Sequence, residues 1–352
     1  MLGIKFPQKL KTSDFEGRPP LAHLKRLTTR EGIIQHADHE VPDPSFGYSI
    51  DDNARAAIVC LWHYNKYNDS SVLQLFNIYY GFIKKVRMEY GSFHNFLSFT
   101  EQLLDSEGSE DSIGRTIWAL GEIAANHPDE KIQKEATEII KGTQLEKHHL
   151  HKNIRSKAFI MLGLLAADQT EEAIKWADEL VEAYKEAGTD EWQWFEDSLR
   201  YDNGLLPYAL AKAYLKTKHS KYLNIAVKTF DWLDEQSRKN GTPIPIGQNG
   251  WYFKGKDKAL YDQQPLEAAT MVLAACAMFE ATKERKYVDK ALNWISWYYG
   301  NNMNKKSIFN KETSGIFDAL TEKGVNLNQG AESIVTYLLA YLTLGAVENG
   351  DK

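Results

Sequence analysis

The chain has 352 residues, of which 43% are hydrophobic and 26% charged, an ordinary globular composition that excludes a disordered or collagen-like polymer. Its 42 basic and 48 acidic side chains give a formal net charge of −6 without a basic stripe, so we expect no nucleic-acid partner. No apolar run reaches the ~18 to 20 residues of a membrane span, and Met1–Leu10 lacks the apolar core of a signal peptide, which predicts a cytoplasmic protein without a membrane partner.

Six segments along the chain begin with a polar cluster and continue into an apolar helix rich in small residues. These helices are apolar around most of their circumference, which predicts that protein surrounds them. They are Asp51–Tyr67, Asp111–Asn126, Asn153–Ala167, Asp202–Thr217, Gln263–Thr282 and Gln329–Val347.

Helices with one charged face alternate with these segments and are expected to form an outer layer. They are Ser71–Tyr90, Asp129–Lys141, Glu171–Ala187, Lys221–Lys239 and Arg285–Tyr299. A short helix at Pro20–Thr29, with proline in its first turn, completes the outer set.

The connections between these helices differ in length. Each inner helix reaches the next outer one through a few residues, as at Asn68–Ser70, whereas the chain returns through long stretches such as Gly188–Tyr201 and Asn240–Asp262. In an antiparallel ring, all long connections lie at the N-termini of the inner helices, where a site is expected. The sequence therefore predicts an all-α fold, a single (α/α)6 barrel over residues 1–352 with residues 1–19 as an N-terminal extension. An open solenoid is the alternative, but it needs capping repeats that are not seen.

The first inner helix opens with two adjacent carboxylates, Asp51 and Asp52, at its positive end. Either one alone is explained as a helix cap, but the pair indicates a site. His36, Asp38 and His39 bring further polar groups to this rim. Their spacing does not favour zinc, and we expect His36 to bind substrate.

A loop before the fourth inner helix is dense in rings and acids. Glu196 follows Trp194 and Phe195 directly, and Asp202 lies six residues further on. We expect the rings to desolvate Glu196, and desolvation favours the protonated carboxyl that a general acid requires. In the alternative interpretation, Trp192 and Trp194 fill the core and Glu196 is a solvated neighbour.

Further rings and polar groups complete the rim. Aromatic rings stack on sugars, and amides and carboxylates pair with sugar hydroxyls, although helix capping also explains each segment taken singly. Asp111 and Arg115 also fit a purely structural i,i+4 salt bridge. With His36 and Asp51, the expected substrate-binding residues are Asp111, Arg115, Trp194, Trp251, Tyr252, Gln263, Gln264 and Glu332.

The sequence shows no signs of a cofactor or of a bound metal. Nucleotide-binding glycine loops, HExxH and GxSxG are all absent from it. Cys60 and Cys276 lie in apolar runs and predict buried free thiols. His148, His149 and His151 are interpreted as solvated loop histidines because no carboxylate cluster lies near them.

The motifs at the helix starts resemble those of a known family. The runs are GYSIDDNARA, SEDSIGRTIWALGE, WQWFEDSLRYDNGLLP, PIGQNGWYFKG, YDQQPLEA and VNLNQGAES. In this order they resemble a bacterial and archaeal family of six-hairpin, glycosidase-like proteins that occur alone or appended to group 1 glycosyltransferases. The resemblance runs from about Leu27 to the C-terminus. The chain departs from the family pattern at Ser49, Ile50, Gly204 and Leu205.

This resemblance implies a role in the metabolism of mannose- or glucose-containing oligosaccharides. The chain resembles the stand-alone form, and the resemblance implies a functional association with a glycosyltransferase. Six-hairpin enzymes mostly invert configuration, so the resemblance also implies an inverting reaction.

Glycoside hydrolysis needs one protonated and one ionised carboxyl group across a sugar-sized gap, roughly 6.5–9.5 Å wide for inversion. We predict Glu196 as the acid and Asp52 as the base, with Asp202 and Asp262 in reserve. Two alternatives stay open: a sugar epimerase or isomerase that works through His36, and a non-catalytic glycan-binding module associated with a glycosyltransferase.

Overall fold

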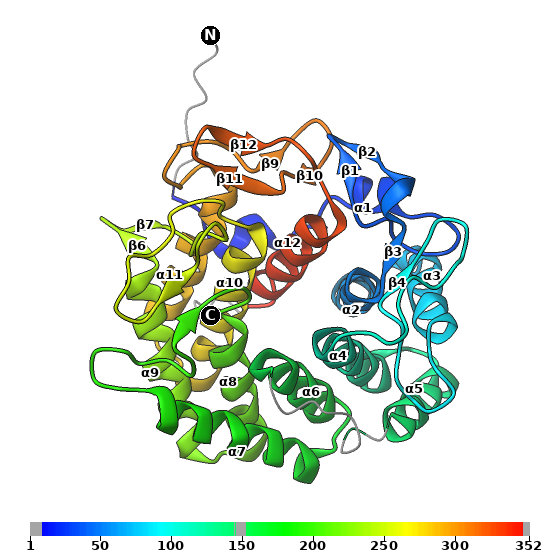
Figure 1. Ribbon diagram of the computed structural model, residues 1–352, viewed down its shortest axis with the longest axis horizontal. Helices are drawn as coiled ribbons and strands as arrows, with labels where there is room; N and C mark the ends of the chain where they lie inside the picture. Colours follow the sequence, from blue (N-terminus) through cyan, green and yellow to red (C-terminus); the bar gives the residue numbers. More distant parts are fainter. Residues whose placement is uncertain (1–8, 144, 146–152, 348–352) are drawn as a thin grey trace.

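The computed structural model describes residues 9–143, 145 and 153–347, and it shows two concentric rings of helices (Figure 1). Each inner helix packs on the next, and the last packs on the first, which closes the ring and excludes an open solenoid. The inner helices are α2 (Ile50–Tyr67), α4 (Glu110–Asn126), α6 (Ile154–Ala166), α8 (Leu205–Thr217), α10 (Pro265–Thr282) and α12 (Ala331–Leu344).

The outer helices each pack on an inner partner and complete six hairpins. They are α1 (Ala22–Leu27), α3 (Val72–Lys85), α5 (Glu130–Gly142), α7 (Thr170–Ala187), α9 (Ser220–Gln236) and α11 (Lys286–Ile295). The (α/α)6 barrel is thereby confirmed. The helix bounds differ from the expected ones by a few residues, most at α3, which ends at Lys85 rather than Tyr90.

Local sequence explains where the inner helices begin and how closely they pack. The Ser49 hydroxyl accepts the backbone N–H of Asp52 at 3.2 Å, which caps the first turn of α2. Between α4 and α6, a Cβ added to Gly121 would lie 2.0 Å from the carbonyl oxygen of Gly163. Glycine at this contact therefore sets the spacing of these two helices.

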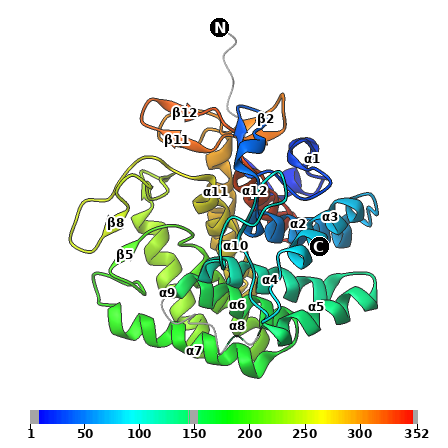
Figure 2. The same ribbon diagram turned by 45° about the vertical axis from the view of Figure 1, so that its right-hand side comes forward.

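The connections are as unequal as the sequence predicts. Short turns from inner to outer helices use left-handed residues, as at Asn68, Lys218 and Lys283. The long connections lie at the opposite end, and the strands at residues 198–199, 252–253 and 319–326 that they carry lie on the left in Figure 2.

Most of these strands have two residues and all pair in antiparallel fashion. Their bounds are β1 (Ala37–Asp38), β2 (Val41–Pro42), β3 (Tyr48–Ser49), β4 (Phe96–Leu97), β5 (Ser198–Leu199), β6 (Arg238–Lys239), β7 (Thr242–Pro243), β8 (Tyr252–Phe253), β9 (Phe309–Asn310), β10 (Gly315–Ile316), β11 (Ala319–Thr321) and β12 (Gly324–Asn326). Short 3-10 helices lie at Thr12–Phe15, Pro44–Phe46 and Ser296–Tyr299.

Helix α10 corrects one expectation, because by length and composition alone it is apolar enough to cross a membrane. Of its 18-residue window, 78% is buried inside the barrel, so its apolar character is that of an inner wall. The two cysteines are buried free thiols, as predicted. His148, His149 and His151 lie outside the described residues.

Candidate active site at the mouth of the barrel

A cavity of about 470 Å³ opens at the N-termini of α2, α10 and α12. Its walls are mostly polar, and they come from α2, from the loop before it and from the loops before α10 and α12. We call it the mouth cavity. The expected site residues that line it are His36, Asp51, Asp52, Asp262, Gln264 and Glu332.

A second cavity of about 450 Å³ lies at the N-termini of α4 and α6 and holds Asp111 and Glu196. The sequence paired Glu196 with Asp52 across one gap, whereas the structure places them on the walls of two different cavities. The reason is the ring itself, because the long connections before α8 and before α2 reach the mouth from different sides.

Glu196 is not the desolvated carboxyl group that the sequence predicted. Trp194 is fully buried and stacks on Trp232 with ring centroids 6.1 Å apart, and Phe195 is also buried. The Glu196 side chain stays 31% exposed and accepts a hydrogen bond from Arg155 Nη1 at 2.7 Å. Burial of an aromatic ring is favourable in free energy and burial of a carboxylate is not. The two rings therefore enter the core while the Glu196 carboxylate stays at the surface. Trp194 is a core residue rather than a sugar-stacking wall.

Gln263 is a second correction. Its side chain is fully buried, donates to the carbonyl oxygen of Leu260 at 2.8 Å and accepts Trp297 Nε1–H at 3.0 Å. The amide therefore holds the connection before α10 in place, and it is not available to a sugar.

Trp251 and Tyr252 are half-buried and line neither mouth-end cavity. Tyr252 packs edge-on against Trp192, with ring centroids 5.1 Å apart. The ring that does line the mouth cavity is Phe96, which the sequence analysis missed; it stands on β4 and is 37% exposed.

Two buried arginines hold the carboxylates of the inner ring. Arg55 is 3% exposed, and its Nη2 lies 3.3 Å from Asp52 Oδ1 and 2.9 Å from Glu332 Oε2. It thereby ties the N-terminus of α2 to that of α12. A buried guanidinium needs such partners, because an unpaired buried charge is strongly destabilising.

Arg115 plays the same part on the α4 side. Its Nη1 lies 3.4 Å from Asp51 and 3.5 Å from Asp111, and its Nη2 lies 3.7 Å from Asp202. The i,i+4 salt bridge that the sequence analysis considered is therefore present. It belongs to a network that joins α2, α4 and the start of α8.

The pKa values of the two carboxyl groups that contact Arg55 shift in opposite directions. Burial raises the pKa of Asp52 to about 6, and Arg55 only partly offsets this. For Glu332, Arg55 and Arg115 outweigh burial and lower the pKa. Neighbouring carboxyls with divergent pKa values are the usual sign of distinct acid and base roles.

Asp202 lies deeper than the mouth cavity. It is 1% exposed, and burial raises its pKa to about 6 against the pull of Arg115 and Arg55. It lines a small internal void together with Arg55. A residue at this depth supports the charge network and does not reach a substrate in the mouth cavity.

Two carboxylates accept backbone N–H groups just before an inner helix, and the sequence analysis did not assign them this role; Glu267 lies in the first turn of α10, and Asp318 lies in the connection before α12. Glu267 accepts the backbone N–H groups of Asp202 and Asn203 before α8. Asp318 accepts the N–H of Gly330 at 2.7 Å before α12 and also lines the mouth cavity. The N-cap residue of α12 is Gly330, which has no side chain to accept a backbone N–H. The sequence could therefore have indicated that a residue from elsewhere supplies the acceptor.

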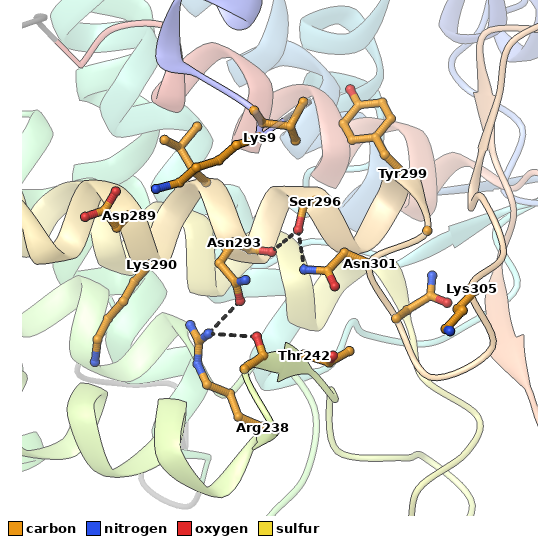
Figure 3. A pocket seen from close by; sticks show the side chains of 15 residues that line it. Lys9, Arg238, Thr242, Asp289, Lys290, Asn293, Ser296, Tyr299, Asn301 and Lys305 are labelled. Carbon is orange, nitrogen blue, oxygen red and sulfur yellow. Dashed lines mark hydrogen bonds between the residues drawn. The ribbon is translucent and has the colours of Figure 1, made fainter. Parts of the chain in front are cut away.

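A cavity of about 730 Å³ on the outer wall, between α11 and the β6–β7 hairpin, is a weaker candidate (Figure 3). Its Arg238 donates to Asn293 Oδ1 at 2.5 Å and to Asp234 Oδ1 at 2.7 Å, and Lys290 pairs with Asp231 at 2.7 Å. These cations are already neutralised, and the cavity lies outside the ring. We therefore place the site at the mouth.

Among the residues that the structure describes, no group of three or more histidine, cysteine or acidic side chains is arranged to hold a metal ion. His39 Nδ1 contacts Asp38 at 2.9 Å, and the exposed ring of His36 packs edge-on against Phe46. The polar groups of the mouth cavity include carboxylates, amides, the Arg55 guanidinium and the imidazole of His36.

Residues 172–317 match the model of Glycosyl Hydrolase Family 88. A cellobiose 2-epimerase from Bacillus thermoamylovorans has a similar structure, with a TM-score of 0.75, 11% identity and coverage of 95% of this chain and 98% of that one. A D-mannose isomerase has a TM-score of 0.71, 11% identity and coverage of 95% of both chains. A GH76 α-mannanase from Bacteroides thetaiotaomicron has a TM-score of 0.65, 12% identity and coverage of 96% of both chains. No curated protein matches the chain in sequence.

The chain shares the fold of these solved structures, and a stretch of less than half its length matches the Family 88 model. The family match and the shared barrel support a sugar-processing enzyme as the class of this protein.

Proposed function

We propose that this protein is a glycoside hydrolase that cleaves an oligosaccharide in the mouth cavity with inversion of configuration. One observation supports this above the others: a cavity of about 470 Å³ holds the buried carboxyl group of Asp52, from α2, and the carboxylate of Asp262, from the connection before α10, to which no group in the described part of the chain hydrogen-bonds. A mannose- or glucose-containing substrate fits the names of the similar structures, a D-mannose isomerase, a cellobiose 2-epimerase and an α-mannanase.

Asp52 is the proton donor in this proposal, which reverses the role that the sequence suggested for it. Its side chain is 8% exposed, and burial raises its pKa to about 6, so the carboxyl group keeps its proton in mildly acidic solution. The Ser49 hydroxyl donates to Asp52 Oδ2 at 2.7 Å and fixes the rotamer. A general acid requires this combination of retained proton and fixed direction.

Asp262 is the base. Within the described part of the chain, no side chain or backbone group hydrogen-bonds to its carboxylate, which leaves both oxygens for a water molecule. Glu332 is less suited, because it and Asp52 contact the same Arg55 nitrogen at 2.9 and 3.3 Å. Those two oxygens are therefore nearer to each other than the roughly 6.5–9.5 Å of an inverting pair.

The reaction follows from these positions. Asp52 gives its proton to the glycosidic oxygen while Asp262 takes a proton from a water molecule that attacks the anomeric carbon from the opposite face. The C–O bond to the leaving sugar breaks as the bond to water forms. Asp52 is left ionised and Asp262 protonated, and exchange with solvent restores both groups.

The epimerase alternative has weaker support at this site. It needs histidines, and among the residues that line the mouth cavity His36 is the one histidine, exposed and packed on Phe46. A non-catalytic binding module would not need a carboxyl group with a raised pKa. The association with a glycosyltransferase and the cytoplasmic location stay predictions.

The test is turnover of a panel of mannose- and glucose-containing oligosaccharides, with reducing ends and product anomers followed by NMR. We expect hydrolysis with inversion, and we expect Asp52→Asn and Asp262→Asn each to lower turnover by about 10²-fold or more while substrate binding is largely kept. The matched control is Asp257→Asn in an exposed loop, which should leave turnover unchanged.

The outcomes separate the three functions. A changed sugar identity without new reducing ends would establish an epimerase, and binding without any turnover would establish a binding module. Near-normal hydrolysis by both mouth variants would show that the carboxyl assignment is wrong. Retention of configuration would indicate that Glu332, which lies closer to Asp52, acts as its catalytic partner instead of Asp262.

A further inference from the structure

The end of the barrel opposite the mouth also holds a large cavity. Its volume is about 760 Å³, and it lies between the C-terminal parts of α2, α4, α10 and α12 and the side of α8 that carries Tyr208 and Lys212. We call it the floor cavity. The residues that define it here are Trp62, Asn65, Asn126, Tyr208, Lys212 and Glu280.

Trp62 provides a fixed aromatic ring in the floor cavity. Its Nε1–H donates to Glu122 Oε2 at 2.8 Å, and its ring packs edge-on against Trp118 with centroids 6.3 Å apart. The side chain is only half-buried, so ring area remains at the cavity. A ring that is oriented by protein and partly uncovered is suited to stack on a ligand.

Tyr208 provides a hydrogen-bond donor that the protein itself does not use. The residue is 6% exposed and lines the floor cavity, yet within the described ranges no group hydrogen-bonds to its hydroxyl. The hydroxyl oxygen is not itself among the fully buried unpaired atoms, so it is open to the cavity, where water or a ligand can bond to it. It offers an occupant of this cavity one hydrogen bond that the protein does not use.

The remaining polar groups fit sugar hydroxyls. Asn126 donates through Nδ2 to Glu122, and its backbone carbonyl accepts from Asn65 Nδ2 at 3.3 Å, which leaves its side-chain amide oxygen for a ligand. Lys212 and Glu280 form an ion pair at 3.4 Å with both side chains partly exposed. The rest of the wall is mostly apolar, from residues such as Leu273, Phe279 and Leu342, and an apolar wall with a few polar groups is the usual composition of a small-molecule site. The negative helix C-termini are opposed by Lys66, Lys212 and Lys283, so the charges around the cavity are close to balanced and a neutral ligand fits.

The floor and mouth cavities are separate. Between them lies a void of about 20 Å³, lined by Arg55 and Asp202 toward the mouth and by Tyr208 and Leu273 toward the floor. That volume suffices for about one water molecule. A sugar that binds at the floor must therefore enter from the short-turn end, and it does not arrive from the catalytic side.

We propose that the floor cavity is a second carbohydrate site that binds a neutral mono- or disaccharide, with its ring on Trp62 and a hydroxyl accepting from Tyr208. The site does not depend on hydrolysis at the mouth. It occupies the face that the short turns leave open at the ends of the inner helices.

The experiment is calorimetric titration of the full chain with D-glucose, D-mannose, D-galactose, cellobiose and α-1,6-mannobiose, together with crystals soaked in the sugars that bind. We expect at least one sugar in the floor cavity. Trp62→Ala should weaken that sugar about tenfold or more, and Tyr208→Phe should weaken it about threefold to tenfold, the effect of one hydrogen bond.

Tyr208→Phe removes one oxygen and preserves the ring, so it keeps the test decisive where Trp62→Ala fails to fold. The control is Tyr90→Phe, an exposed tyrosine on the outer surface, which should leave the affinity unchanged. The proposal is overturned if no sugar of the panel binds, if the bound sugar lies only in the mouth cavity, or if Tyr208→Phe and Trp62→Ala leave its affinity at the wild-type value.

Discussion

The two ends of the barrel are built from the same six helices and differ in almost every chemical respect. At the mouth, helix N-termini are positive and the side chains that gather there are acidic, whereas at the floor the C-termini are negative and Lys66, Lys212 and Lys283 line the cavity. Long connections supply much of the mouth wall. Short turns supply little at the floor, so its groups come from the helices themselves. A ring of parallel helices thus creates two distinct surfaces.

The charges at the two ends also differ in burial. Arg55 at the mouth is 3% exposed and pairs with Asp52 and Glu332, whereas the Lys212 and Glu280 side chains at the floor are 37% and 54% exposed. Buried charges that lose a partner are costly, and exposed ion pairs contribute little. Stability should therefore respond to charge removal at one end only.

The largest expected effect tests this difference directly. Arg55→Met keeps the volume but leaves Asp52 and Glu332 without their shared cation, so we expect the free energy of unfolding to fall by about 3–5 kcal/mol. Lys212→Met breaks the exposed pair with Glu280 and should cost less than about 1 kcal/mol. Urea denaturation at neutral pH measures both. Equal losses in the two variants would show that burial at the mouth does not govern the stability of the barrel.

A second prediction concerns the pH dependence of turnover at the mouth. The proposed acid, Asp52, must hold its proton, and its pKa is raised to about 6 by burial. Half of the molecules hold this proton at pH 6 and about one in a hundred at pH 8, so kcat/KM should fall about 50-fold between these values. The matched measurement uses Asp257→Asn, whose profile should follow the wild type. A flat profile over this range would contradict the assignment of Asp52 as the acid.

The sequence was sufficient for the barrel because the evidence for it is local. Apolar helices that alternate with one-sided ones, and connections of unequal length, are both read within short windows. The same holds for Asp51, Asp52 and Glu332, which stand in the first turn of their helices and therefore at the mouth. Asp262 followed from its position just before α10.

The predictions that failed depend on contacts between residues far apart in the sequence. Trp194 is a core residue because Trp232, on the outer helix α9, covers it, and Gln263 is fully bonded because Trp297 lies against it. Glu196 stays at the surface because Arg155 of α6 reaches it. No local pattern distinguishes a tryptophan that fills a gap from one that lines a cavity, since both stand in loops rich in polar residues.

The smallest expected effect lies at the floor, where Glu122 accepts Trp62 Nε1–H at 2.8 Å and Asn126 Nδ2–H at 2.9 Å through one oxygen. Glu122→Gln keeps the size and an acceptor oxygen, so we expect a loss of about 1 kcal/mol or less near pH 5. Burial raises the pKa of Glu122, against the hydrogen bond from Trp62 and the charge of Lys212.

The folded protein therefore holds a proton on Glu122 at a pH where the unfolded chain has already released it, because the ordinary pKa of glutamate is about 4.3. Stability must then fall as the pH rises from that value through the raised pKa of the folded state. Glu122→Gln has no proton to lose, so its deficit relative to the wild type should shrink between pH 5 and pH 8 in urea denaturation. A deficit that instead grows with pH would mean that the folded barrel stabilises the ionised carboxylate, and the floor would then resemble the Arg55-paired carboxylates of the mouth.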